Sequence, residues 1–318
     1  MTAGAPRASH NSENASWQAL PFDVWRDTCD TLHAHTQVLG KLAVALAPPE
    51  PQLQHAALRL AARGWETQPL PAPDHSGALV VALDLHAHDA VVEHSDGRTH
   101  RVALMPHRSV GEVTRELLAG ISELVGAVQI NTTPQEVPWT LPLDQDDEHA
   151  TYDPEHVESY LAAATQAALV LGELRAPFHG RSTPVNAWWG TFDLAVGFFS
   201  GRSADPPSDG FITRNSADAE QIEIGWWPGD DRYPRPAFYG FAFPAPPNFE
   251  AGTVSPGAAS WNNELGEYIL DWDDARREPD PHAAAVEFGR SVIRHSCDAC
   301  EWDPTLAASA LGVPPPIH

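Results

Sequence analysis

Residues 185–200 read VNAWWGTFDLAVGFFS, and this stretch decides the fold predicted for the C-terminal half of the chain. Its aromatic, β-branched and small residues are typical of a strand. Three further stretches of the same kind follow it: QIEIGWW at 221–227, AFYGFAF at 237–243 and EYILDW at 267–272. Loops rich in proline, glycine and aspartate separate the four. We therefore predict a mainly antiparallel sheet.

Helices are predicted on either side of these strands. Asp153 followed by Pro154, and Asp280 followed by Pro281, are each an N-cap residue with proline in the first turn. The first pair opens an amphipathic stretch whose apolar residues share one helical face through Leu171. This half of the chain therefore combines helices with an antiparallel sheet.

The N-terminal half shows the same mixture of patterns. Its predicted helices lie at about 25–43, 51–63 and 109–124, the last opened by a capping box of Ser109 and Glu112. Its predicted strands lie at 78–92, 99–105 and 128–131, with an Asp96-Gly97 turn between the first two. The fold class predicted for the whole chain is therefore α+β, with helices packed on a mainly antiparallel sheet in each half.

A stretch without periodicity divides the two halves. Residues 132–152 contain prolines and then an acidic run, and they follow neither a helical nor a strand pattern. The predicted domains are a flexible tail at 1–19, an N-terminal half at 20–143, a C-terminal half at 152–306 and a second tail at 307–318.

Composition excludes several classes of function. The chain has 19 Lys and Arg against 43 Asp and Glu, a net charge of -24. Nucleic acids and anionic membranes are recognised by clustered basic residues, so neither is predicted as a partner. Lys41 is the only lysine and follows no glycine-rich loop, which argues against phosphate-loop and Schiff-base chemistry. The chain also lacks a dinucleotide-binding motif, and we predict no cofactor.

Cysteine content and hydropathy bear on location. Three cysteines at low density fit a reducing compartment better than a disulfide scaffold. No run of eighteen apolar residues is present, and the first sixteen residues lack the features of a signal peptide. We predict a cytoplasmic protein. Cys297 and Cys300 continue the buried stripe of the closing helix, so a packing role is favoured over a redox or zinc site.

Several motifs identify a family resemblance. Residues 184–195 match a Pro-Val-x-x-x-Trp-x-x-Phe-Asp-Leu-Ala pattern that ends in Phe-Ser-Gly-Arg at 199–202. Glu220, the turn GWWPGD at 225–230 and the strand start AFY at 237–239 follow. The chain resembles an uncharacterised bacterial family, a domain of unknown function (number 5996), from about residue 17 to residue 303. The resemblance implies no activity. The family pattern often has histidines where this chain has Asn186 and Ala219, which argues against carrying over a metal site.

Carboxylates on neighbouring strands form the candidate catalytic group. In a regular strand, alternation places Trp189 and Asp193 on the face opposite to Trp188, and separates Glu220 from Glu223. If Asp193 meets one of these glutamates in a partly dry cleft, one carboxyl has a raised pKa and the two divide acid and base roles. The catalytic candidates are Asp193, Glu220 and Glu223. The ligand-binding candidates are the aromatic and polar residues His179, Asn186, Trp189, Arg202, Trp226, Trp227 and Tyr239.

Two classes of function remain open at this level. The first is a small-molecule enzyme or ligand-binding protein with a cleft lined by aromatic and carboxylate side chains. The second is a noncatalytic structural or protein-interaction module, in which the same tryptophans only fill the core and Asp193 caps a turn or pairs with Arg202. The sequence names no protein partner, substrate or reaction. A cavity with converging polar groups distinguishes the first class from the second.

Asp84, His86 and His88 are a weak candidate metal site. Alternate residues of a strand share one face, so this Asp-x-His-x-His series places three ligand types together. A solvated sheet edge is the alternative that we favour, because the chain supplies no further ligand motif. We therefore predict no metal.

Overall fold

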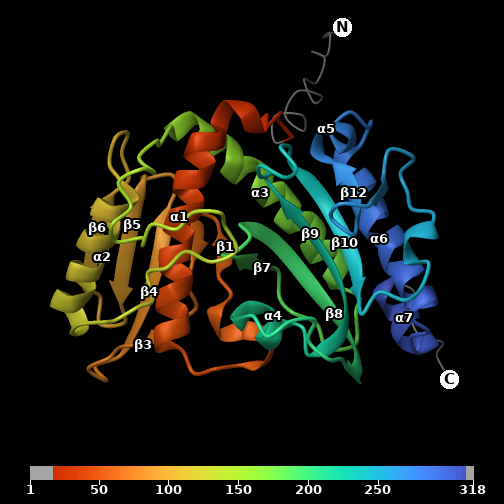
Figure 1. Ribbon diagram of the computed structural model, residues 1–318, viewed down its shortest axis with the longest axis horizontal. Coiled ribbons are helices and arrows are strands. Elements are labelled where there is room, and N and C mark those ends of the chain that lie inside the picture. The colour runs from red at the N-terminus through yellow and green to blue at the C-terminus, as the bar shows by residue number, and fades with distance from the viewer. Residues whose placement is uncertain (1–16, 313–318) are drawn as a thin grey trace, which may run out of the picture.

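Two six-stranded antiparallel sheets form the framework of the computed structural model, which describes residues 17–312 (Figure 1). The first sheet belongs to the N-terminal half and the second to the C-terminal half, and helices pack around both. The predicted α+β fold, with helices on an antiparallel sheet in each half, is confirmed. No helix within residues 17–312 is long and apolar enough to cross a membrane.

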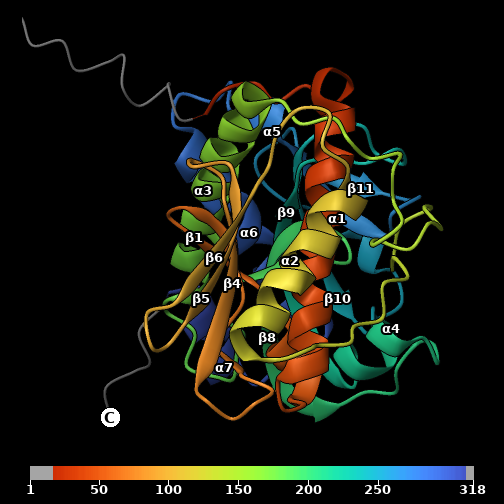
Figure 2. The same ribbon diagram turned by 90° about the vertical axis from the view of Figure 1, so that its left-hand side faces the viewer.

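The first sheet has the strand order β1-β2-β4-β5-β6, with β3 also paired to β4. Its strands are β1 (Arg59–Ala61), β2 (Gly64–Glu66), β3 (Leu70–Pro71), β4 (Ala78–Asp84), β5 (Asp89–His94) and β6 (Thr99–Ala103). Helices α1 (Phe22–Leu46) and α2 (Val110–Val125) lie side by side on one face of this sheet (Figure 2). The predicted capping box is present: Ser109 accepts from the Glu112 amide, and Glu112 accepts from the Ser109 amide.

Three elements predicted in this half are wrong. The single strand expected at 78–92 is two strands, β4 and β5, because the chain turns at 85–88. The helix expected at 51–63 is a short 3-10 helix, η1 (Pro51–Ala56), followed by β1. Gln52 and Leu53 have φ values of 51° and 53°, so the chain leaves the right-handed helical region at once. The strand expected at 128–131 is absent, because these residues lie near the surface and pair with no neighbouring strand.

The second sheet has the order β11-β12-β10-β9-β8-β7. Its strands are β7 (Asn186–Trp188), β8 (Asp193–Ser203), β9 (Ala219–Trp227), β10 (Ala237–Phe243), β11 (Ser260–Asn262) and β12 (Glu267–Asp271). Residues 185–200 therefore form a hairpin instead of one strand. The chain reverses at 189–192, where Phe192 has a φ of 60°, and Trp188 pairs with Asp193.

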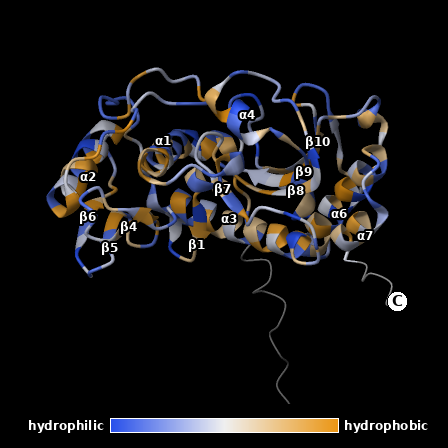
Figure 3. Cartoon of the chain, turned by 90° about the horizontal axis from the view of Figure 1, so that it is seen from below, coloured by the Kyte–Doolittle hydropathy of each residue, from blue (hydrophilic) through white to orange (hydrophobic). Residues whose placement is uncertain are grey.

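Helices cover one face of the second sheet. The long helices α3 (Pro154–Arg175) and α6 (Pro281–Ala299) pack on its inner face, and the short helix α4 (Phe211–Ser216) lies on the opposite side (Figure 3). The remaining short helices are η2 (Phe249–Ala251), α5 (Trp272–Ala275) and α7 (Pro304–Ala310). The long helices thus leave the opposite face, beside α4, open to a site.

One large hydrophobic core runs through both halves, and a smaller second cluster includes Trp227 and Tyr239. The Trp65 indole of β2 donates a hydrogen bond to Tyr160 Oη of α3 at 2.9 Å, and Phe192 stacks on both rings at centroid distances of 5.2 and 5.1 Å. Trp17 also belongs to this core and stacks on Trp272, although it falls within the tail predicted at 1–19. Residues 1–16 of that tail and 313–318 of the C-terminal one lie outside the described residues. Helix α7 continues to Ala310, past the predicted start of the second tail at 307.

Candidate functional site

Strand register gathers one set of side chains on the free face of the second sheet. Tyr239 of β10 is paired with Gly225 of β9, and Gly225 is paired with Ala195 of β8. Two residues further along β9, Glu223 is paired with Gly197. Because alternate residues share a face, these small residues lie beside Tyr239 and Glu223 and leave a hollow between them. A Cβ atom at Gly225 would lie 2.3 Å from the Tyr239 ring, so the ring occupies the space that a side chain would take.

The hollow is a cavity of about 460 Å³. Its floor is the free face of β8, β9, β10 and β12, and its walls come from η1, α4 and the turn at 188–191. The size falls within the range of ordinary small-molecule sites. The cavity therefore lies between a segment of the N-terminal half and the sheet of the C-terminal half.

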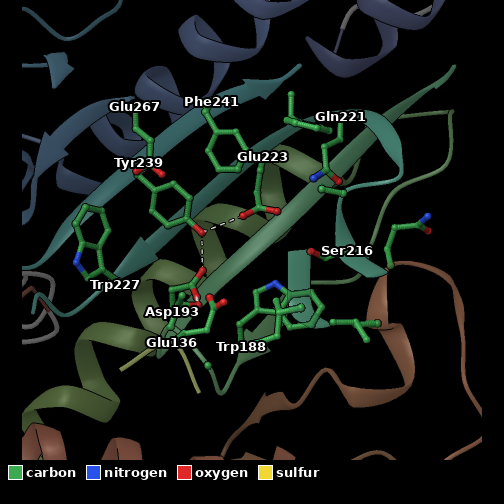
Figure 4. Close-up of a pocket in the computed structure, with 18 of the residues that line it drawn as sticks. Glu136, Trp188, Asp193, Ser216, Gln221, Glu223, Trp227, Tyr239, Phe241 and Glu267 are labelled. Atoms are coloured by element: carbon green, nitrogen blue, oxygen red, sulfur yellow. Dashed lines mark hydrogen bonds between the residues drawn. The ribbon is translucent and has the colours of Figure 1, made fainter. Parts of the chain in front are cut away.

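Two carboxyl groups share one phenol at the centre of the cavity (Figure 4). Tyr239 Oη lies 2.5 Å from Asp193 Oδ2 and 3.2 Å from Glu223 Oε1. A phenol has a single hydrogen, so it donates to only one carboxylate at a time. The shorter contact assigns that hydrogen to Asp193. The contact with Glu223 is then favourable when Glu223 itself carries a proton.

Asp193 and Glu223 have different pKa values because their surroundings differ. Burial raises the pKa of Asp193 to about 6, although hydrogen bonds from Thr191 and Tyr239 partly oppose the rise. Burial, together with the charge of Asp193, raises the pKa of Glu223 to about 8. The same two causes raise the pKa of Glu267 on β12 to about 7. Between about pH 6 and pH 8, the pair therefore holds one base, Asp193, and one acid, Glu223.

Aromatic rings line the cavity beside the carboxyl groups. Trp227 contacts Tyr239 edge to face at a centroid distance of 5.4 Å, and Phe241 lies parallel to Tyr239 at 6.3 Å. Trp188 forms part of the opposite wall (Figure 4). Trp189 borders the cavity but is only 2% exposed, and its indole donates to the Ala56 carbonyl at 3.1 Å. The turn at 189–192 breaks strand alternation, which is why Trp188 and Asp193 line the same cavity, contrary to prediction.

Unfavourable backbone conformations gather around the cavity. Nine non-glycine residues in the described part of the chain have a positive φ. Gln52, Leu53 and Glu136 are three of these and line the cavity, and a fourth, Phe192, lies between two lining residues. Such conformations cost free energy and persist where the surrounding structure holds them, often at functional sites. Their position marks this cavity as the candidate site.

Glu220 and Arg202 lie away from the cavity, on the other side of the sheet. Arg202 Nη2 donates to Glu220 Oε1 at 2.6 Å, and Ser200 Oγ donates to Glu220 Oε2 at 2.6 Å. Burial acts to raise the pKa of Glu220, but the hydrogen bonds from Arg202 and Ser200 outweigh it and hold the pKa below the usual value. Arg202 also donates to the Cys300 carbonyl at 2.5 Å. The structure therefore makes Glu220 part of a closed ion pair and does not bring Arg202 to Asp193.

Three other predicted ligand-binding residues also lie outside the cavity. Asn186 is fully buried and bonds to Arg59 and Gln54, which joins β7 to the N-terminal half. Trp226 is fully buried in the core, because it faces the helices. His179 is exposed near α7. Of the predicted site residues, the cavity brings together Asp193, Glu223, Trp189, Trp227 and Tyr239.

Sequence reasoning missed other lining residues. Gln221 and Glu267 lie on predicted strands, and alternation from Glu223 was sufficient to place Gln221 on the same face. Trp188 was assigned to the wrong face. Glu136 and Gln52 come from a loop and from η1, and no pattern in the sequence connects these segments with the sheet.

The Asp84 group does not form a metal site. The chain turns at 85–88, so the strand alternation expected for Asp84, His86 and His88 does not apply. Asp84 Oδ1 accepts from the backbone of His86 and Ala87, and His88 Nδ1 lies 3.0 Å from Tyr152 Oη. Within residues 17–312, no group of three or more His, Cys, Asp and Glu side chains is arranged to hold a metal ion.

The fold and the cavity together define an α+β protein with an acidic, aromatic-lined pocket between its two halves. A family model described as "Family of unknown function (DUF5996)" matches residues 17–309, and the chain belongs to this family. The resemblance seen in the sequence motifs is thereby confirmed. Searches of curated proteins and of solved structures found no match.

Proposed function

We propose that this protein is a small-molecule enzyme in which Asp193 and Glu223 perform acid–base catalysis on a ligand held in the cavity. The observation that supports this most strongly is the single Tyr239 hydroxyl placed between two carboxyl groups that face an open cavity. A purely structural module gains nothing from this arrangement, because a buried carboxylate without a cation is costly.

The proposed chemistry follows from the different protonation of the two groups. Near neutral pH, ionised Asp193 accepts a proton from the substrate, and protonated Glu223 donates one to another atom of it. Tyr239 then allows the two carboxyl groups to return to their starting protonation states. Protonated Asp193 returns its proton to the phenol oxygen while the phenol hydrogen passes to Glu223, which restores one carboxylate and one carboxylic acid.

We also propose a cytoplasmic location, and a bacterial origin as the family resemblance implies. Cys29, Cys297 and Cys300 are free thiols, which suits a reducing compartment. Burial raises the pKa of Cys297 to about 12 and that of Cys300 to about 11, so both thiols are poor nucleophiles.

A ligand screen tests the proposed function. Metabolites are added to the wild-type chain at pH 7, and a compound at about a hundred times its Kd stabilises the fold by about 2.7 kcal/mol. Each compound that binds is then assayed for turnover with the wild type and with Asp193→Asn and Glu223→Gln. Glu278 is exposed and does not line the cavity, so Glu278→Gln is the control variant.

We expect turnover to fall by about 10²–10⁴ in Asp193→Asn and Glu223→Gln and to stay unchanged in Glu278→Gln. Turnover that survives in both cavity variants would show that the carboxyl pair is not the catalytic group. If compounds bind and none is turned over, the protein is a ligand-binding protein and the proposed catalysis is wrong.

A further inference from the structure

The charge of the cavity lining is strongly unbalanced. Six acidic residues line it: Glu136, Asp193, Glu223, Asp230, Glu264 and Glu267. Arg232 is the one basic residue in the lining, and its guanidinium is paired with Asp230 at 2.8 Å. No basic side chain in the described part of the chain forms an ion pair with Asp193, Glu223 or Glu267. The central carboxyl groups therefore face the cavity and not a protein cation.

The aromatic lining favours the same kind of occupant. The faces of Trp, Tyr and Phe rings attract cations, most strongly where water is excluded. Trp227, Tyr239 and Phe241 lie next to Glu223 and Glu267 (Figure 4). A cation in the cavity would meet the ionised Asp193, the acidic groups of Glu223 and Glu267, and aromatic rings, and these are the groups that hold an ammonium or guanidinium.

Gln221 is an independent sign of a ligand. Its side chain is 8% exposed and lines the cavity two residues before Glu223 on β9, where it extends into the same space (Figure 4). Its amide makes no hydrogen bond with any of residues 17–312 and borders the cavity, so its donor and acceptor atoms are open to a ligand. A ligand group that accepts from and donates to this amide would complete the site.

We propose that the cavity takes a small organic cation, an amine or a guanidinium compound, that carries an amide or hydroxyl group for Gln221. This proposal rests on the proposed function and names its class of substrate. The cationic nitrogen lies among Asp193, Glu223 and Glu267. The second polar group lies about 7 Å away, because alternate residues on a strand are separated by about that distance.

The experiment uses a panel of linear amines with four to eight heavy atoms between the termini. Pentylamine carries only the cation, 5-aminopentanamide carries the cation and the amide, and N-acetyl-5-aminopentanamide has lost the charge. The corresponding guanidinium compounds and Mn²⁺ alone complete the panel. Binding to the full chain is measured by calorimetry at pH 7 and low salt.

We expect 5-aminopentanamide to bind at least about tenfold more tightly than its acetylated form, because the charge is lost on acetylation. Glu267→Gln should weaken every amine by about tenfold. Gln221→Leu should weaken 5-aminopentanamide by about tenfold and leave pentylamine unchanged. Glu278→Gln should change nothing.

Other results overturn the cation proposal in distinguishable ways. Equal binding of the acetylated compound, or no binding of any amine or guanidinium compound, contradicts it. Stoichiometric binding of Mn²⁺ that is lost in Glu267→Gln shows a metal site instead. If a neutral compound is turned over and Asp193→Asn abolishes its turnover, the substrate class is wrong but the acid–base function stands.

Discussion

Tyr239 determines how the two central carboxyl groups behave. Its one hydrogen stabilises the charge of Asp193, and burial with the charge of Asp193 keeps Glu223 protonated. The pKa values differ because the hydrogen bonds differ. Asp193 also accepts from Thr191, whereas the only contact of Glu223 with the phenol is the longer one, at 3.2 Å. Two carboxyl groups of similar intrinsic acidity thereby acquire different roles.

Glu223→Gln should make the protein more stable at high pH. The pKa of Glu223 rises from 4.5 to about 8 on folding, so the folded state binds the proton more tightly than the unfolded state. The free energy of unfolding therefore falls as the pH rises between these values. The variant removes this loss, and we expect a gain on the order of 2 kcal/mol at about pH 9 that disappears near pH 4. Urea unfolding at a series of pH values measures it. A gain that does not depend on pH would contradict the assigned protonation.

Tyr239→Phe should raise the pKa of Asp193 above 6. The substitution removes a hydrogen bond that stabilises the carboxylate form. We also expect a loss of about 1.5–3 kcal/mol of stability above that pH, since the bond involves a charged group. The ¹³C resonance of the Asp193 carboxyl carbon reports the pKa. An unchanged or lower value would show that the phenol does not donate to Asp193.

Strand β9 determines where the cavity forms. Its alternate residues Ile222, Ile224 and Trp226 face α3 and α6, while Gln221, Glu223 and Trp227 face the cavity. Gly225 lies between the last two and leaves room for the Tyr239 ring. A single glycine in the strand thus decides whether the phenol can reach both carboxyl groups.

Gly225→Ala should displace Tyr239 and destabilise the sheet by about 1–3 kcal/mol, because the new methyl group overlaps the ring. The variant should also lose catalytic activity. Gly172→Ala is the matched control: a methyl group at this helical glycine would meet nothing within 4 Å apart from the adjoining backbone of its own helix, so alanine should raise stability by up to about 1 kcal/mol. Thermal unfolding of the two variants checks the comparison. Wild-type stability in Gly225→Ala would contradict the packing described for β9.

Local patterns predicted much of the fold at the level of elements. Capping signals at Asp153 and Asp280 identified α3 and α6, and the strand predicted at 237–243 has the bounds of β10. Two of the errors have a common cause. The turn at 189–192 and η1 both depend on residues with positive φ that are neither glycine nor asparagine, and these conformations are held by contacts distant in sequence.

The candidate site could be predicted only where it lies on regular strands. Asp193, Glu223 and Tyr239 were found because strand alternation and aromatic composition are visible in the sequence. Glu220 was included as a candidate because the sequence does not show that it lies on the face away from the cavity. On that face Arg202 pairs with it. Glu136 reaches the cavity through tertiary contacts alone, which no local pattern encodes.

The two halves share one core, which has a consequence for the whole molecule. Trp65 of the first sheet contacts Tyr160 and Phe192 of the C-terminal half, and Phe192 adjoins Asp193. Residues of η1, in the N-terminal half, form part of the cavity wall. The fold and the site therefore depend on both halves together.

Trp65→Ala should weaken both halves. The residue is fully buried, and its loss should cost about 3–5 kcal/mol. Because the core is continuous, hydrogen-exchange protection should fall in β9 as well as in β4. Reduced protection confined to the first sheet would instead mean that the halves unfold independently.

The ¹³C titration of the Asp193 and Glu223 carboxyl carbons in the wild-type protein tests the central claim most directly, with Asp193→Asn and Glu223→Gln providing the assignments. We predict inflections near pH 6 for Asp193 and near pH 8 for Glu223, so that one group is ionised and the other protonated at neutral pH. Titration of both groups below about pH 5, as for ordinary solvated carboxyl groups, would contradict it.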